Sequence, residues 1–213
     1  MTVETLKKNA QEIFTRLNKR YPAPEPALDY ETPWQLLVAT VLAAQCTDER
    51  VNKVTPALFA KWPDAATMAK ADIPDLEKMV HSTGFFRNKA KNLKAAAERV
   101  TEVYKGELPT TMKEMITLGG VARKTANVVL SNGLGINEGI AVDTHVKRIS
   151  FRLGLTENTS PVKVEKDLMP IFDQNQWSDI NHYLVFFGRE VCKARTPQCA
   201  ECELNDICPK NGV

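Results

Sequence analysis

The sequence has almost no cysteine outside its tail and no long hydrophobic run. In a chain of 213 residues, only Cys46 precedes residue 192. No segment approaches the roughly 20 apolar residues that a membrane span needs. The N-terminal stretch "MTVETLKKNAQEIF" lacks the apolar core of an export signal. We therefore expect a cytoplasmic protein without a membrane partner, in a reducing compartment where disulfides are rare.

Strand patterns, internal repeats and low-complexity tracts are missing as well. No segment sustains the alternation of apolar and polar residues that a strand requires, whereas apolar residues often recur every three or four positions. Hydrophobic residues make up 43% of the chain. A chain of this length and composition buries a sizeable core without cross-links. The fold class is predicted to be all-α.

Proline and glycine divide the chain into blocks. A first helix is predicted over residues 3–21, and the prolines of "YPAPEPAL" end it. A second begins at Pro33 with a capping box between Thr32 and Gln35, and it is apolar on nearly every side, as expected inside a domain. The glycine-rich stretch "SNGLGINEG" marks the next boundary. The two predicted domains comprise residues 26–136 and residues 1–25 with 137–213.

The charge is unevenly distributed although the net charge is only +2. Residues 81–152 contain 12 Lys or Arg against 6 Asp or Glu. A basic middle favours a face that binds a polyanion, and nucleic acid is the first candidate. A solvated helix face, such as "RNKAKNLKAAAERV", explains the same charge equally well.

The stretch "LGGVARKTANVVL", residues 118–130, points to chemistry. Two glycines before a helix leave backbone N–H groups for an anion, although a tight turn between two helices has the same pattern. Arg123 and Lys124 face the positive end of the helix dipole, which costs about 0.3–1 kcal/mol each. Such a local misfit is more common at functional sites. Positive surroundings also favour a neutral, nucleophilic amine at Lys124, which makes it a candidate for Schiff-base chemistry.

Asp143, in "IAVDTHVKR", is the candidate partner of that lysine. It follows a short apolar run and precedes a predicted helix. Most aspartates in this position are only N-caps. A carboxylate can also take a proton from a lysine nucleophile. Both roles are open for Asp143 on the sequence alone.

Four cysteines in the last 22 residues have the spacing C-x6-C-x2-C-x5-C. Four thiolates hold either Zn²⁺ or an iron–sulfur cluster, and the residue types alone favour neither. A zinc ribbon more usually has two C-x2-C pairs, whereas this tail has one. The four candidate ligands are Cys192, Cys199, Cys202 and Cys208.

"LGGVARKTANVVLSNGLG", "AVDTHVKR" and the cysteine pattern, in this order, resemble the endonuclease III family. These are DNA glycosylases with an AP-lyase activity, within the helix-hairpin-helix superfamily. The resemblance extends from "ETPWQLLVATVLAAQCTD" to Cys208. It implies a six-helix barrel that contains the hairpin, a discontinuous iron–sulfur domain and a cleft between the two. It also implies that the four cysteines hold a [4Fe–4S] cluster.

The resemblance assigns roles to individual residues. Lys124 matches the lysine that attacks C1′ of the damaged nucleotide, and Asp143 matches the catalytic aspartate. Gln45 matches a residue inserted into the gap left by the flipped base, and Phe85 an apolar wedge. Without the family, Phe85 would be assigned to the core. The remaining expected DNA contacts are Gly120, Ala122, Arg123, His145, Lys193 and Arg195.

The implied partner is double-stranded DNA that carries oxidised pyrimidines or abasic sites. We expect a monomer that is associated with the nucleoid through DNA. Two alternatives stay open: a monofunctional glycosylase, for example for mismatched adenine, and a non-catalytic DNA-binding or electron-transfer protein. Monofunctional relatives lack the lysine, whereas this chain has Lys124. A non-catalytic protein would lose no function on Lys124→Ala.

The hairpin departs from the family pattern L-P-G-V-G at two positions. Gly119 replaces the proline and is expected to loosen the turn, a loss of about 0.4–1 kcal/mol. Ala122 replaces the last glycine and would be strained if its φ were positive. Elsewhere, Asp48 fits either a pocket residue or a helix cap, and we favour the cap.

Overall fold

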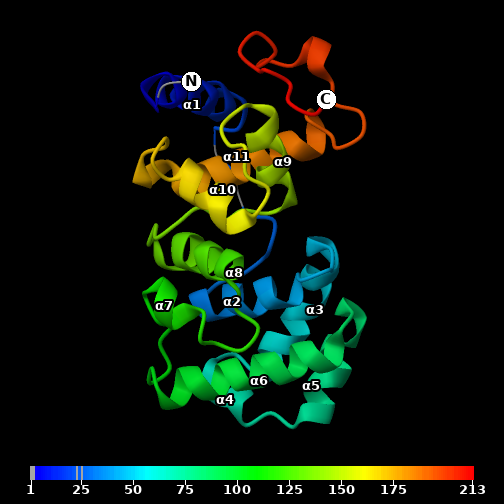
Figure 1. Ribbon diagram of the computed structural model, residues 1–213. Helices are drawn as coiled ribbons and strands as arrows, with labels where there is room; N and C mark the ends of the chain where they lie inside the picture. Colours follow the sequence, from blue (N-terminus) through cyan, green and yellow to red (C-terminus); the bar gives the residue numbers. More distant parts are fainter. Residues whose placement is uncertain (1–2, 23, 25) are drawn as a thin grey trace. The chain divides into compact units, whose positions relative to one another are not determined.

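The computed structural model describes residues 3–22, 24 and 26–213, and this part is helical without any β-strand (Figure 1). The prediction of an all-α fold is confirmed. The proline-rich segment that was predicted to end the first helix includes residues 23 and 25, which lie outside the described residues. Along the described chain, no helix has the length and apolar character needed to cross a membrane.

The chain divides into two compact units. The central unit is Pro26–Glu138, and the terminal unit combines Met1–Glu25 with Gly139–Val213. The central unit contains α2 (Pro33–Leu42), α3 (Asp48–Lys61), α4 (Ala65–Ala69), α5 (Ile73–Val80), the 3₁₀ turn η1 (His81–Thr83), α6 (Phe86–Glu102), α7 (Met112–Met115), α8 (Arg123–Val128) and the π-helical turn η2 (Val129–Gly133).

The core of the central unit surrounds α2. Every residue of this helix from Trp34 to Leu42 is buried, and α2 contacts α3, α6, α8 and η2 (Figure 1). A helix that is apolar on every side gains most from such complete burial. The expectation that this helix lies inside a domain is confirmed.

The N-terminal caps of α2 and α3 differ in part from those expected from the sequence. Thr32 Oγ1 accepts a hydrogen bond from the Gln35 N–H at 3.2 Å, as the capping box requires. The Gln35 side chain, however, accepts from the N–H of residue 31 at 2.7 Å, one position before the expected partner. At α3 the cap is Thr47, whose Oγ1 accepts from the N–H of residue 50 at 3.3 Å. The expectation that Asp48 caps α3 is therefore wrong, because Asp48 is its first helical residue.

The terminal unit is built on close packing between two helices. Its elements are α1 (Val3–Arg20), α9 (Thr144–Arg152), α10 (Pro161–Leu168), η3 (Gln174–Gln176), α11 (Trp177–Glu190) and η4 (Cys199–Glu201). A Cβ atom on Gly188 of α11 would lie 2.6 Å from His145 Nδ1 and 2.7 Å from Ile149 Cδ1, both on α9. Glycine is therefore needed for α11 to approach α9 this closely, and α11 then leads directly to Cys192.

The hairpin between α7 and α8 is ordered by two buried apolar residues. Leu118 and Val121 are both buried, and the Val121 N–H donates to the Leu118 carbonyl at 3.2 Å. Gly120 has φ +76°, in the left-handed region that favours glycine. Ala122 has φ −87° and ψ 169°, an extended conformation that any residue adopts. The strain considered for alanine at this position is absent.

Gly119 has a packing role that the sequence did not reveal. A Cβ atom here would lie 2.4 Å from the backbone carbonyl oxygen of Asn92 and 3.2 Å from Ala95 Cβ, both on α6. The hairpin therefore packs its backbone directly on α6. Glycine at this position does more than loosen the turn, because it permits this contact.

We predict that restoring the family proline, Gly119→Pro, lowers the free energy of unfolding. The new ring atoms would meet the Asn92 carbonyl, and overpacking of this kind costs about 1–3 kcal/mol. That exceeds the gain of about 0.4–1 kcal/mol from stiffening the unfolded chain. Urea unfolding measures the change, with Ala122→Gly in the same hairpin as the control expected to cost less than about 1 kcal/mol. A higher urea midpoint for Gly119→Pro would contradict the packing argument.

Candidate functional site

Lys124 is an exposed residue on an anchored helix of the central unit. It is the second residue of α8, whose next turn buries Ala126 and Asn127. The N-cap, Ala122, offers no side-chain hydrogen bond, and its carbonyl accepts from the Ala126 N–H at 2.9 Å. The backbone under Lys124 is thus fixed while its amine remains accessible to a substrate.

Asp143 is a half-buried residue of the terminal unit and is the N-cap of α9. Its Oδ1 accepts from the Val146 N–H at 2.8 Å. An ionised carboxylate has about four acceptor sites on two oxygens. Capping through Oδ1 therefore leaves acceptor capacity for a proton transfer. The cap role is real, and it does not exclude the catalytic one. Lys124 and Asp143 belong to different units of the chain.

His145 is the second residue of α9 and is half-buried against α11. Its Nδ1 is 3.3 Å from Nη2 of Arg148. Burial is the main cause that lowers the pKa of this imidazole, the Asp143 carboxylate raises it, and the Arg148 guanidinium lowers it further. These contacts favour the neutral ring. The expected contact of His145 with DNA stays a prediction.

Gln45 and Phe85, the two expected inserting residues, share an unusual backbone conformation. Their φ angles are +53° and +47°, and both residues are exposed. Left-handed backbone costs a residue other than glycine roughly 1–3 kcal/mol and tends to cluster at functional sites. Phe85 leaves 63% of its surface exposed. Its assignment to the core, the alternative considered without the family, is therefore wrong, and the wedge role stays a prediction.

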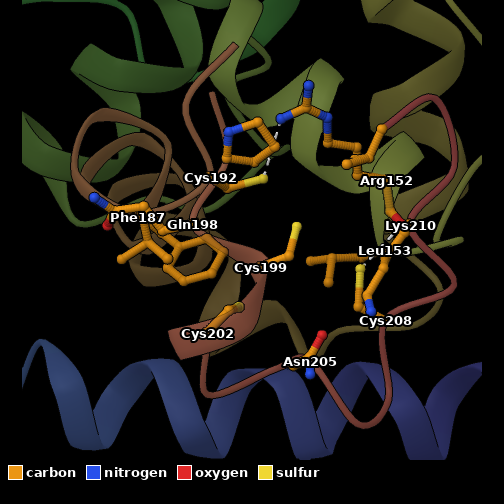
Figure 2. A pocket seen from close by; sticks show the side chains of 13 residues that line it. Arg152, Leu153, Phe187, Cys192, Gln198, Cys199, Cys202, Asn205, Cys208 and Lys210 are labelled. Carbon is orange, nitrogen blue, oxygen red and sulfur yellow. Dashed lines mark hydrogen bonds between the residues drawn. The ribbon is translucent and has the colours of Figure 1, made fainter. Parts of the chain in front are cut away.

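The four cysteines of the tail line one pocket. Cys192 follows α11, Cys199 begins η4, Cys202 is the C-cap of η4, and Cys208 lies in the loop beyond. Apolar side chains, including Leu153, Phe187 and Val191, line the same pocket (Figure 2). All four thiols are free and half-buried. The sequence separates Cys192 from Cys208 by 16 positions, and the structure brings both to the same cavity.

The four cysteines at this pocket form a donor set that fits either a zinc ion or an iron–sulfur cluster. Two of the sulfur atoms accept hydrogen bonds. Cys202 Sγ accepts from the Leu204 N–H, and Cys192 Sγ accepts from Arg152 Nη1, both at 3.4 Å.

The pocket does not stabilise isolated thiolates. Burial is the main cause that raises the pKa of the Cys202 and Cys208 thiols. A bound [4Fe–4S] cluster would offset this penalty, because metal coordination favours the deprotonated thiol. The surroundings of these thiols are therefore suited to metal ligands rather than to reactive nucleophiles.

Arg152 is a residue of the site that the sequence analysis missed. It is 6% exposed, and it donates from Nη1 to the Lys193 carbonyl and from Nη2 to the Ala194 carbonyl, each at 2.8 Å. The backbone of the loop between Cys192 and Cys199 is thereby fixed to α9, while the Lys193 and Arg195 side chains remain exposed. In the sequence, Arg152 looks like an ordinary cation in the last turn of a helix.

Two family models match the chain. The HhH-GPD superfamily base excision DNA repair protein model matches residues 38–174. The iron–sulfur binding domain of endonuclease III matches residues 192–208, which span the four cysteines. The helical fold, the hairpin and the cysteine pocket thus define a protein of the HhH-GPD superfamily of base excision DNA repair.

Comparison with individual proteins narrows this class. Endonuclease III of Synechocystis sp. is 55% identical over 95% of this chain and 93% of its own length. A non-covalent endonuclease III–DNA complex has a TM-score of 0.89, and a trapped endonuclease III–DNA covalent intermediate has 0.90. Each is 41% identical, with 96% of both chains covered. The chain belongs to the endonuclease III family, and the predicted [4Fe–4S] cofactor is confirmed.

Proposed function

We propose that the protein excises oxidised pyrimidines from double-stranded DNA and then cleaves the strand at the abasic site, with Lys124 as nucleophile. The observation that carries the proposal is the exposed Lys124 at the start of α8, directly after the hairpin. It is supported by a relative, 41% identical over 96% of the chain, that was captured as a covalent intermediate with DNA. Such an intermediate needs a nucleophile on the protein.

The chemistry follows from an amine and a carboxylate. The neutral Lys124 amine attacks C1′ of the flipped nucleotide, the glycosidic bond breaks and the base leaves with a proton. Asp143 accepts a proton from the amine and stabilises the cationic sugar. The C1′–O4′ bond then breaks, O4′ takes up the proton held by Asp143, and the opened sugar is left with a Schiff base between C1′ and Lys124. The Schiff base acidifies the C2′ proton, and loss of that proton expels the 3′ phosphate. Water then hydrolyses the imine and frees Lys124.

The cysteine pocket has a supporting role in this proposal. Cys192, Cys199, Cys202 and Cys208 would hold the [4Fe–4S] cluster, which supplies a cross-link between distant segments of the tail. Arg152 holds the loop that begins at Cys192. The exposed Lys193 and Arg195 on this loop then contact DNA phosphates. We further propose that the protein acts as a monomer in the cytoplasm, bound to the nucleoid through DNA.

We predict that Lys193→Ala and Arg195→Ala each reduce the salt dependence of DNA binding. Removal of one phosphate contact lowers the slope of log K against log salt by about 1. Fluorescence anisotropy on undamaged duplex at several salt concentrations measures the slope. Lys163→Ala, an exposed lysine on α10 of the same unit, is the control and should leave the slope unchanged. Unchanged slopes in both loop variants would remove these residues from the interface.

The proposed function is tested by borohydride trapping on a duplex with one thymine glycol. We expect a covalent protein–DNA adduct and a strand break. Excision of the base without an adduct would identify a monofunctional glycosylase. Neither excision nor an adduct, on this lesion and on an abasic site, would leave a DNA-binding protein and overturn the proposal.

A further inference from the structure

Lys89 is a buried cation without a carboxylate partner in the part of the chain that the structure describes. It is the fourth residue of α6 and is only 5% exposed. Its Nζ donates to the carbonyl oxygens of Leu42 and Thr83, both at 2.7 Å. Burial lowers the pKa of this ammonium group, and the nearby Cys46 opposes that effect. Lysine is almost never buried unless it is paired, so this one requires an explanation.

The two carbonyls belong to the segments that carry the proposed inserting residues. Leu42 ends α2, and Gln45 follows it by three residues. Thr83 ends η1, and Phe85 follows it by two residues. The Leu42 carbonyl is among the last four of α2, which have no partner within the helix. One ammonium group thus joins the end of α2, which leads into the Gln45 loop (residues 43–47), to the Phe85 turn (residues 83–85).

We propose that Lys89 is a positioning residue that clamps the Gln45 loop to the Phe85 turn, so that both side chains enter the duplex at a fixed separation. The inference rests on the proposed function of these two residues. Left-handed backbone persists at exposed residues only where the surrounding structure holds it. Charge-assisted hydrogen bonds in a dry environment are among the stronger means of doing so. If the Gln45 loop and the Phe85 turn are held in place before binding, less ordering is required when DNA binds.

A purely structural role for Lys89 is the competing explanation, and the chain offers a matched control. Lys94 lies on the same helix, is half-buried, and donates from Nζ to the Ala71 carbonyl at 2.7 Å. It resembles Lys89 in donating to a backbone carbonyl of another segment, although it also lies 4.0 Å from Glu98 Oε1, and it has no hydrogen bond to Leu42 or Thr83. Lys89→Met and Lys94→Met each replace the ammonium group by an apolar group of similar length.

The first measurement is the ratio of two affinities, for a duplex with a tetrahydrofuran abasic analogue and for an undamaged duplex. We expect Lys89→Met to lower this ratio about 10- to 100-fold, as misplaced binding groups do, with an unchanged affinity for undamaged duplex. Lys94→Met should keep both affinities. Hydrogen exchange without DNA should accelerate at residues 43–47 and 83–86 in Lys89→Met alone. If Lys89→Met does not fold, Lys89→Gln, which keeps a neutral donor, takes its place.

A double-mutant cycle separates a clamp from an independent effect. In the Gln45→Ala/Phe85→Ala background, Lys89→Met should lower the ratio no further, because the clamp acts only through those two side chains. An equal further loss, or an unchanged ratio in Lys89→Met itself, overturns the inference. A wild-type protein that does not prefer the abasic duplex overturns the proposed function as well, so the two failures are distinguishable.

Discussion

Lys124→Ala is expected to abolish the covalent adduct and strand cleavage, and to slow base excision by at least about 10³-fold, since it removes the nucleophile itself. The loss should not come from unfolding. Lys124 is exposed, and alanine has the highest helix propensity of all residues. Single-turnover excision, borohydride trapping and thermal unfolding of the same preparation measure the three quantities.

The control for Lys124 is another exposed lysine of the central unit, Lys70, at the C-cap of α4. Lys70→Ala should trap and cleave at the wild-type rate. Lys124→Ala should still bind the tetrahydrofuran duplex within a fewfold of wild type, because the hairpin and the inserting residues are untouched. Retained excision in Lys124→Ala would contradict the proposed nucleophile and would favour an activated water instead.

The proposed nucleophile and the cysteine ligands could be identified because their signals are local. Lys124 stands within one contiguous stretch, residues 118–130, and the four cysteines fall in the last 22 residues. The position of α2 was also predictable, since a helix that is apolar on all sides has to lie inside a core. In each case the physical reason is contained in a short stretch of sequence.

Residues that hold backbone segments in place were not predictable, because their partners are distant in the sequence. Lys89 donates a hydrogen bond to the carbonyl of Leu42, 47 positions away, and Arg152 donates one to the carbonyl of Lys193, 41 positions away. Both look like ordinary helix-surface cations in the sequence. Gly119 is similar, since the Asn92 carbonyl that excludes a side chain there lies on another helix. These roles depend on contacts between segments that are distant in the sequence, and the local spacing of apolar residues does not reveal such contacts.

Phe85 illustrates the limit of periodicity at a helix end. Two aromatics stand side by side in "TGFFRNKA", and only one can follow the buried face of α6. Phe86 packs against the core, whereas Phe85 takes a left-handed conformation before the helix and is exposed. The sequence pattern fits either assignment. The choice depends on the backbone at the N-cap, which the helical period does not describe.

Asp143→Asn is expected to separate the two roles of this residue. Asparagine caps a helix about as well as aspartate, so the free energy of unfolding should change little. The amide cannot accept the lysine proton, and excision should slow by about 10²- to 10⁴-fold. Asp143→Ala loses the bond to the Val146 N–H as well and should cost a further 0.5–2 kcal/mol, roughly, of stability. Urea unfolding and single-turnover excision measure the two effects.

Asp64 supplies the matched control, because it caps α4 by accepting from the Thr67 N–H at 2.8 Å. Asp64→Asn and Asp64→Ala should reproduce the stability changes at Asp143 while leaving the excision rate unchanged. If Asp143→Asn kept full activity and Asp143→Ala lost activity only in step with stability, Asp143 would be a cap and nothing more. If a fully stable Asp143→Asn variant loses activity, the chemistry needs a carboxylate at this position, because asparagine and aspartate cap a helix about equally well.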